Sequence, residues 1–440
     1  MPTASDNACI TNGTAGTPTV VNVTGILAEV NNLQLGGFNT LNINSSASVS
    51  GGLQVNGTQI INNGQIDLNA GAHNAGIQLE SASGATLSGT GTITLSTSGA
   101  GLAYLGQTSA GHTLTNQSTI DGAGQIGNGA LRLDNQGTVN ANTNGQILSI
   151  TGSDPATDVN TGTLEATNGG ILQINDETVN NQNGTITVGA GSSIQVVNNG
   201  TIEGWGNISA GGTLNNGGTI NANTNGQILS LAGVGGYTNT GTLEATRGGI
   251  LQINQATVND QNGTITAGAG SSIQLVNNAV VQGGTFFNNL GMLSIDNTSS
   301  FVVGGAQAGT GYIQLANGML NEMIASNNSF GVINSSSSAL LNGTLNILLQ
   351  GSFDPTVGST FKILLANAGQ INGTFSSIEN DTFTGGPEAG TEKWVVDYDS
   401  AGGYVELIAE PLPEPKVLFI LVPALLGAGF KLRHQLFRVV

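Results

Sequence analysis

The chain of 440 residues contains much glycine and few charged side chains, which excludes several common protein classes. Glycine occupies 69 positions, and only 8% of the residues are charged, whereas ordinary globular domains contain about 25% charged residues. Compact helical or α/β enzymes need charged helix faces and bulky cores, so this composition disfavours them. Nine prolines and no three-residue glycine period exclude collagen. Because 38% of the residues are hydrophobic and Val, Ile and Leu recur regularly, disorder is also disfavoured.

The charge balance excludes further functions. Eight Lys and Arg residues stand against 26 Asp and Glu residues, for a formal net charge of −18. Four of the eight cations follow residue 415, so the rest of the chain cannot neutralise a phosphate backbone and we expect no nucleic-acid partner. The single cysteine, Cys9, excludes a disulfide framework and a cysteine-based zinc site.

Internal repeats dominate residues 50–340, after a predicted N-terminal segment or solenoid cap at 1–49. Residues 160–199 match residues 239–278 at 34 of 40 positions, and GTVNANTNGQILS at 137–149 recurs as GTINANTNGQILS at 218–230. The duplicated unit therefore spans about 137–217 and 218–285.

A shorter motif recurs within these units about every 20 residues: an apolar residue, an asparagine, a Gly/Asn turn, then Thr-Ile or Thr-Leu. Alternating β-branched residues bounded by Asn and Gly predict short strands, and stacked asparagines can form amide ladders. The anchoring asparagines are Asn116, Asn135, Asn160, Asn180, Asn198, Asn215, Asn239, Asn259 and Asn277.

This period predicts an all-β fold, a right-handed parallel β-helix (β-solenoid) of about 14 coils between residues 50 and 340. Each coil would stack on the last at about 4.8 Å, with inward Ile, Leu and Val building one continuous core. A stack of antiparallel hairpins is the alternative, and the near-constant period favours the β-helix.

Residues 341–410 are predicted to form a C-terminal β cap. Within them, Trp394–Tyr398, a turn at Asp399–Gly403 and Tyr404–Ile408 predict a hairpin. A cap would shield the apolar end of the solenoid and its unpaired strand edges.

Parallel β-helices also include polysaccharide lyases and hydrolases, which need a cation beside acids or clustered carboxylates. The repeat region holds two cations, Arg132 and Arg247, and Arg247 replaces Asn168 of the sister copy, as expected of a surface position. Glu165 and Glu244 occur in both copies, which we interpret as one repeated face position. We therefore predict no enzyme activity and no catalytic residue.

The remaining candidate residues also favour a non-catalytic surface. Asp176-Glu177 becomes Gln255-Ala256 in the second copy, which indicates solvated surface. His73 and His112 have no acidic or serine partner at a recognisable spacing. We expect no metal site and no cofactor, although Asp397 and Asp399 at the hairpin turn leave a weak calcium site as an alternative to solvated acidic surface. Steps such as Thr92-Ile93-Thr94 resemble ice-binding faces, but we do not expect them at one position of every coil.

The tail at residues 411–440 carries the most specific signal. It contains Pro413, Glu414 and Pro415, an apolar run at 417–430, and a basic end with Lys431, Arg433 and Arg438. Fourteen apolar residues in a helix span about 21 Å, short of the ~30 Å hydrocarbon core, and the flanking lysines extend that reach. We expect a single hydrophobic C-terminal transmembrane helix with its basic end in the cytoplasm.

This tail resembles the PEP-CTERM sorting signal of exported proteins of Gram-negative bacteria. The resemblance implies Pro413, Glu414 and Pro415 as the sorting motif, with Lys431, Arg433 and Arg438 as the basic membrane-stop end. It implies removal of the tail by exosortase, a membrane protease, after transient anchoring in the inner membrane. Lys416 departs from the small residue usual after the motif. The upstream GTLEAT and GGILQI repeats also resemble autotransporter-like β-strand repeat proteins.

The sequence thus predicts an exported, non-enzymatic solenoid of the cell surface or extracellular matrix. We expect a structural or adhesin-like role, with glycans or components of the biofilm matrix as partners. Residues 1–21 lack the basic and apolar regions of an export signal, so we expect that signal upstream of the sequence. The alternatives are a carbohydrate-active β-helix enzyme and an autotransporter passenger fragment.

Overall fold

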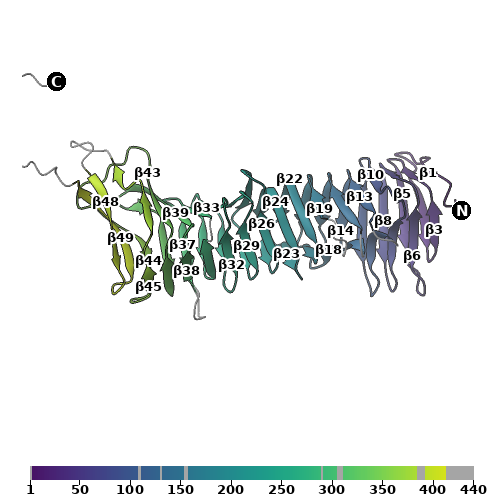
Figure 1. Ribbon diagram of the computed structural model, residues 1–440. Helices are drawn as coiled ribbons and strands as arrows, with labels where there is room; N and C mark the ends of the chain where they lie inside the picture. The colour runs from purple at the N-terminus through teal and green to yellow at the C-terminus, as the bar shows by residue number, and fades with distance from the viewer. Residues whose placement is uncertain are drawn as a thin grey trace, which may run out of the picture.

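The computed structural model describes residues 2–107, 111–128, 131–152, 157–288, 291–304, 311–383 and 392–412. These residues contain 49 strands and no helix. They form an elongated rod with the N-terminus at one end and β48 and β49 at the other (Figure 1). Strands one coil apart pair in parallel throughout the repeat region, so the rod is a parallel β-solenoid of about 14 turns. This confirms the predicted solenoid over a stack of hairpins.

The strands of successive coils stack into three faces, and β22 and β24 run through the corner from the first face into the second. The first face contains β1 (Ala8–Ile10), β4 (Leu33–Leu35), β7 (Gln59–Asn62), β10 (Ala85–Ser88), β13 (Thr113–Asn116), β16 (Arg132–Asn135), β19 (Asp158–Asn160), β22 (Thr178–Val188), β24 (Thr201–Ala210), β26 (Thr219–Ala222), β29 (Thr242–Ala245), β32 (Thr264–Ala267), β35 (Thr285–Asn288), β38 (Gly311–Gln314), β42 (Ser338–Leu341) and β45 (Ile371–Gly373).

The second face also takes in the later halves of β22 and β24. Its other strands are β2 (Thr19–Thr24), β5 (Asn39–Asn44), β8 (Gln65–Ala70), β11 (Thr92–Thr97), β14 (Thr119–Gly122), β17 (Thr138–Ala141), β20 (Thr163–Ala166), β27 (Ile228–Ala232), β30 (Ile250–Asn254), β33 (Ser272–Val276), β36 (Met292–Ile295), β39 (Met319–Ser326), β43 (Thr344–Leu349) and β46 (Ser377–Glu379).

The third face completes each coil. It contains β3 (Leu27–Val30), β6 (Gly51–Val55), β9 (Ala75–Leu79), β12 (Ala103–Gln107), β15 (Gly124–Asn128), β18 (Ile147–Thr151), β21 (Ile171–Asn175), β23 (Ser193–Val197), β25 (Thr213–Asn216), β28 (Gly236–Asn239), β31 (Thr257–Asn259), β34 (Val280–Gln282), β37 (Ser300–Val303), β41 (Val332–Ser335) and β44 (Thr360–Leu365). The remaining strands are β40 (Ser329–Phe330), β47 (Thr382–Phe383), β48 (Glu392–Asp399) and β49 (Tyr404–Pro411).

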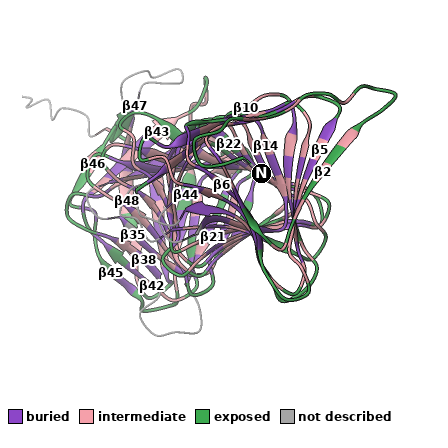
Figure 2. Ribbon diagram, turned by 90° about the vertical axis from the view of Figure 1, so that its right-hand side faces the viewer, coloured by how far each residue is buried: buried purple, intermediate pink, exposed green. Residues whose placement is uncertain are grey.

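One apolar core runs the length of the solenoid. Along each strand, inward and outward residues alternate, and the inward residue of one coil lies on the inward residue of the next. On the second face, Ile93 stacks on Ile120 and Ile120 on Val139, and all three are buried. Burying a side chain of this size stabilises the fold by about 1.5–3 kcal/mol. Viewed from the N-terminal end, buried residues line the strands, and the corner loops are exposed (Figure 2).

A ladder of buried asparagines lies inside the corner between the first and second faces. The side-chain amide of Asn116 donates to Asn135 at 2.8 Å, Asn135 to Asn160 at 2.8 Å, and Asn160 to Asn181 at 2.7 Å. Asn181 ends the ladder by donating to the backbone carbonyl of Trp205 at 2.9 Å. Each amide thereby satisfies a polar group that would otherwise be buried without a partner.

Several predicted anchor asparagines differ from the ones that the fold buries. The buried residues are Asn181, Asn216 and Asp260, one position after the predicted Asn180, Asn215 and Asn259. Two more predicted anchors, Asn198 and Asn277, are exposed and adopt positive φ values of 49° and 58°. At Asn180, Asn215 and Asn259 the buried residue is the next one along the chain because neighbouring strand residues alternate between inside and outside, which the spacing alone does not resolve. The pairs Asn198-Asn199 and Asn277-Asn278 instead form exposed turns with positive φ at both residues.

The two sister copies of the duplicated unit lie on different faces. Val139 of the first copy belongs to β17 on the second face, and its sister Ile220 belongs to β26 on the first face. The asparagine ladder changes corner accordingly, because Asn216 donates to Asn239 at 2.7 Å and Asn239 donates to Asp260 between the third and first faces. The repeat length is thus not a whole number of turns.

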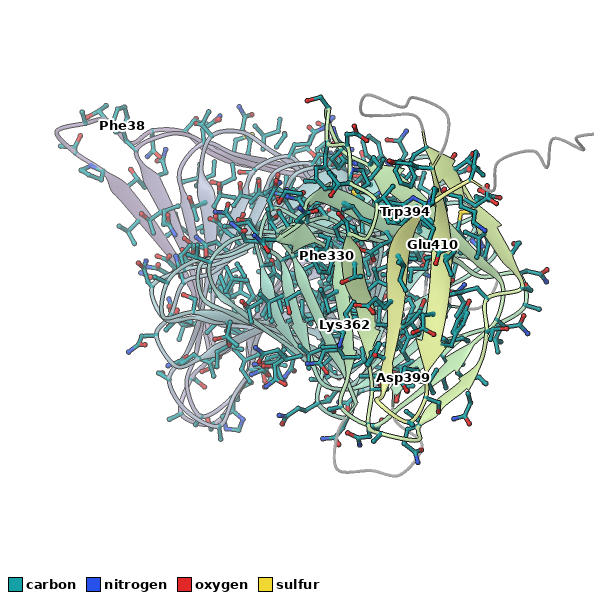
Figure 3. The ribbon with its side chains drawn as sticks, turned by 90° about the vertical axis from the view of Figure 1, so that its left-hand side faces the viewer. Phe38, Phe330, Lys362, Trp394, Asp399 and Glu410 are labelled. Atoms are coloured by element: carbon teal, nitrogen blue, oxygen red, sulfur yellow. The ribbon has the colours of Figure 1, made fainter. Side chains whose placement is uncertain are left out.

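Antiparallel pairing occurs at the C-terminal end of the rod. Strand β48 pairs with β49, and β49 pairs with β44 on the third face. The hairpin covers the predicted strands and extends each of them by a few residues. Figure 3 shows this hairpin in front of the last coils, with Trp394 near its upper end and Asp399 at its turn. The Trp394 ring centroid lies 5.6 Å from that of Phe361 and 4.7 Å from that of Phe383.

The asparagine ladder gives a test of this fold. Replacing Asn160 by alanine removes the acceptor of Asn135 and the donor to Asn181, which leaves buried polar groups unpaired. We expect a loss of about 1–3 kcal/mol in the free energy of unfolding, measured by urea denaturation. Replacing Asn22 by alanine is the control, because Asn22 accepts from the amide of Asn42 at an exposed position of β2, and its expected loss is below about 0.5 kcal/mol. Equal losses in the two variants would contradict the ladder.

Candidate functional surfaces

The predicted sorting residues Pro413, Glu414, Pro415, Lys431, Arg433 and Arg438 lie outside the described residues. Within the part of the chain that the structure describes, no helix is long and apolar enough to cross a membrane. The candidate surfaces that can be described are the outward sides of the three faces.

Threonines form two long outward rows. On the second face, five consecutive coils stack threonine on threonine, and on the first face six coils do so. The rows are Thr92, Thr119, Thr138, Thr163 and Thr185, and then Thr178, Thr201, Thr219, Thr242, Thr264 and Thr285. The two rows follow the change of face between the sister copies. These rows were missed at the level of sequence because Thr-x-Thr segments such as Thr92-Ile93-Thr94 were considered. Only the first threonine of such a segment recurs on successive coils.

The position two residues further along each strand carries acids on alternate coils. On the second face, the successive residues are Asp67, Thr94, Asp121, Asn140 and Glu165. On the first face, Asn221 similarly separates Glu203 from Glu244. Because carboxylates on adjacent coils would lie about 4.8 Å apart and repel, this alternation lets an acidic chain stack its coils.

Hydrogen bonds fix these acids on the surface. The Thr94 hydroxyl donates to Asp121 at 2.7 Å, and the Asn142 amide donates to the other oxygen of Asp121 at 3.1 Å. The Asn223 amide makes the matching bond to Glu203 at 2.8 Å in the second copy. Partial burial raises the pKa of both Glu165 and Glu244.

Glu165 and Glu244 do not share a face, contrary to the prediction. Glu165 lies in β20 on the second face, whereas Glu244 lies in β29 on the first. Each nonetheless stacks between an asparagine and a threonine. The duplication therefore repeats the local environment of the glutamate but places it on a different face of the rod.

Other candidate residues lie apart from one another or inside the wall. Arg247 is exposed, as predicted, and Asp176 is also exposed. The neighbouring Glu177 is buried, so the prediction of solvated surface was wrong there. The outward turn at Asp176, with φ 52°, directs the next residue inward, where the second copy has the smaller Ala256.

Arg132 contributes structure rather than an exposed charge. Its Nε donates to the carbonyl of Thr157 at 2.9 Å. His112 is buried and His73 is half-buried. Among the described residues, no group of three or more His, Cys, Asp or Glu side chains is placed to hold a metal ion. At the hairpin turn, the backbone N–H of Gly402 donates to Asp399 and lowers the pKa of that carboxyl.

Among the described residues, the carboxyl groups of Asp260 and Glu322 are the most deeply buried. Asp260 takes the place of Asn181 in the second copy and accepts from Asn239, and its Oδ2 has no hydrogen-bond partner within the described ranges. Burial raises the pKa of Asp260 to about 7. Glu322 in β39 is fully buried, and burial raises its pKa well above the ordinary value.

These surfaces offer hydroxyl, amide and well-separated carboxylate groups on a rigid scaffold. Such groups can bind ligands by hydrogen bonding along the direction of stacking. A comparison with models of protein families and with curated proteins finds no match to the chain.

Asp260 makes stability depend on pH. Because the folded protein favours the neutral carboxyl, stability is highest below the unfolded pKa of about 4. It falls as the pH rises towards 7 and stays constant above that. Replacing Asp260 by asparagine should remove this dependence and stabilise the protein at pH 8 by about 2–4 kcal/mol, as measured by urea denaturation at pH 4.5 and pH 8.

The reciprocal variant is the control for the Asp260 prediction. Replacing Asn181 by aspartate introduces the same buried carboxyl at the sister position, so it should destabilise the protein more at pH 8 than at pH 4.5. Unchanged stability of both variants at pH 8 would contradict the buried position of Asp260.

The alternation of acids gives an electrostatic prediction. Replacing Asn221 by aspartate places three carboxylates on successive coils with Glu203 and Glu244. We expect destabilisation of about 0.5–2 kcal/mol at low salt, which 0.5 M NaCl largely removes by screening. The matched control is Asn215→Asp, since its neighbours on the adjacent coils, Gln195 and Thr238, are uncharged. A salt-independent loss at position 221, measured by thermal unfolding, would contradict the stacking.

Proposed function

We propose that this protein is an exported, non-enzymatic solenoid that acts as a structural or adhesive component of the cell surface or extracellular matrix. The observation that carries the proposal is the pair of threonine rows, which run over consecutive coils of a rigid rod. Repeated hydroxyl groups at about 4.8 Å spacing can contact extended polymers. Because the chain has few cations, we do not expect these polymers to be polyanions. We also propose that the solenoid coils in a right-handed sense, because connections between parallel strands are generally right-handed.

The route to the surface rests on the tail sequence. The motif Pro413-Glu414-Pro415, the apolar run and the basic end with Lys431, Arg433 and Arg438 support recognition by an exosortase-type membrane protease, with transient insertion in the inner membrane. The hairpin β48–β49 stands directly before this tail in the chain. We propose that it caps the solenoid, so that cleavage leaves a closed rod.

A carbohydrate-active enzyme is the second candidate, and one observation favours it. Asp67 and Asp121 lie two coils apart on the second face, which corresponds to about 10 Å. This spacing lies just beyond the range of about 6.5–9.5 Å that separates the carboxyl groups of inverting glycoside hydrolases. Release of reducing sugars from a polysaccharide, abolished in both Asp67→Asn and Asp121→Asn, would establish the enzyme. No release from neutral and acidic polysaccharides would favour the non-enzymatic role.

An autotransporter passenger is a third candidate, which rests on the repeat motifs alone.

Cell fractionation with intact-mass analysis tests the export proposal. The gene with its upstream DNA is expressed in its native host, and the protein is recovered from each fraction. We expect a surface or secreted species that has lost the residues after the Pro413–Pro415 motif, while a variant with these three residues replaced by alanine keeps its tail and stays in the inner membrane. An intact wild-type tail in the cytoplasm would contradict export.

A further inference from the structure

A notch interrupts the corner between the second and third faces. In the coil of β14 and β15, a single residue, Ala123, joins the two strands. The coils on either side have five-residue loops at the same corner, 98–102 and 142–146. The short corner between two longer loops leaves a groove of about 510 Å³ that opens onto the third face.

Two glycines make the short corner possible. Gly122 and Gly124 have φ values of +104° and +156°. A Cβ atom on Gly122 would lie 2.0 Å from the carbonyl oxygen of Leu95, and one on Gly124 would lie 2.3 Å from that of Ala103. The backbone of the corner therefore lies directly against the preceding coil, and only glycine permits this approach. The notch is a fixed feature of the wall.

The groove presents hydrogen-bonding groups in register. Gln125, Ser149 and Gln173 occupy the same outward position on three successive coils of the third face. The Ser149 hydroxyl is shielded from solvent and has no hydrogen-bond partner within the described ranges. Leu102 and Ile147 line the sides, and Ile147 is 42% exposed. The site thus combines amides, a hydroxyl and aliphatic surface.

We propose that this notch binds one chain of a neutral glycan. In a protein of net charge −18, no Asp, Glu, Lys, Arg or His among the described residues lines the groove, so the described lining matches an uncharged ligand. Amide and hydroxyl groups pair with sugar hydroxyls, and Leu102 and Ile147 pack on the C–H faces of the rings. The flanking loops are two coils apart, about 10 Å, which admits a single chain. The proposal deepens the adhesive role proposed above by naming its ligand class and rests on that role.

The sister corner supplies the design of the test. The sequence TIDGAG at 119–124 recurs as TIEGWG at 201–206, with Trp205 in the place of Ala123. Both corners precede equivalent pairings, Gly124 with Leu148 and Gly206 with Leu229. A tryptophan between the two glycines is therefore compatible with the solenoid, and Ala123→Trp should obstruct the notch without unfolding the chain.

Isothermal titration calorimetry of the full chain in detergent tests the proposal. The probes are maltohexaose, cellohexaose and chitohexaose, with hexagalacturonate as the acidic counterpart. We expect at least one neutral hexasaccharide to bind, and Ala123→Trp to weaken this binding at least tenfold. Ser149→Ala should weaken it several-fold. Ala72→Trp, which adds the same ring to an exposed corner loop at another coil, should bind as the wild type does.

Several outcomes would overturn the proposal. They are no binding of the three neutral hexasaccharides, tighter binding of hexagalacturonate, or unchanged binding in Ala123→Trp with a wild-type circular dichroism spectrum. If Ala123→Trp fails to fold, unchanged binding in Ser149→Ala overturns it instead. The titration does not depend on where the protein is located in the cell. Glycan binding by a protein found in the cytoplasm would therefore contradict only the export proposal, and a correctly sorted protein that binds no glycan would contradict only the proposed glycan site.

Discussion

In-register hydrogen bonding between parallel coils is the constraint on which the rest of the structure depends. It places each residue about 4.8 Å from its counterpart one coil away, so side chains at equivalent positions stack on one another along the rod. Apolar residues that face inward become a continuous core, and inward asparagines become a ladder in which Asn135 both accepts and donates. Outward threonines become rows, whereas acids occupy alternate coils. The low charge content of the chain follows from the same constraint, because stacked like charges repel.

Much of the fold could be predicted from the sequence because strand period and side-chain alternation are local properties. The strands that begin with Thr-Ile or Thr-Leu, such as β20, β29 and β32, and the hairpin at Trp394 lie where the sequence pattern predicts them. The inward residue of an Asn-Asn pair could not be predicted, since Asn180 and Asn181 are the same residue type and only the alternation within β22 decides which of them points inward. The burial of Glu177 was missed for a similar reason, because its direction depends on the positive φ of Asp176. The notch at Ala123 depends on loop lengths in three coils, which no single motif reveals.

The rotation between sister copies has a functional consequence. A duplication that spanned a whole number of turns would have extended each surface along one face. Here the threonine row passes from the second face to the first at β22, which contributes Thr178 to one row and Thr185 to the other. The copies also differ at the notch, with Ala123 in one corner and Trp205 in the equivalent one. Duplication has therefore produced two distinct surfaces from one unit, and the proposed glycan site belongs to only one of them.

A distance between spin labels on one outward row tests the stacking most directly. Asn42 and Thr187 lie on the second face, connected by successive pairings through Asp67, Thr94, Asp121, Asn140 and Glu165. In a Cys9→Ser background, cysteines at these two positions carry the labels for double electron–electron resonance. Six coil steps predict a narrow distribution centred near 29 Å, widened by a few ångströms by the label tethers. A broad distribution, or a centre beyond about 40 Å, would contradict the parallel in-register solenoid.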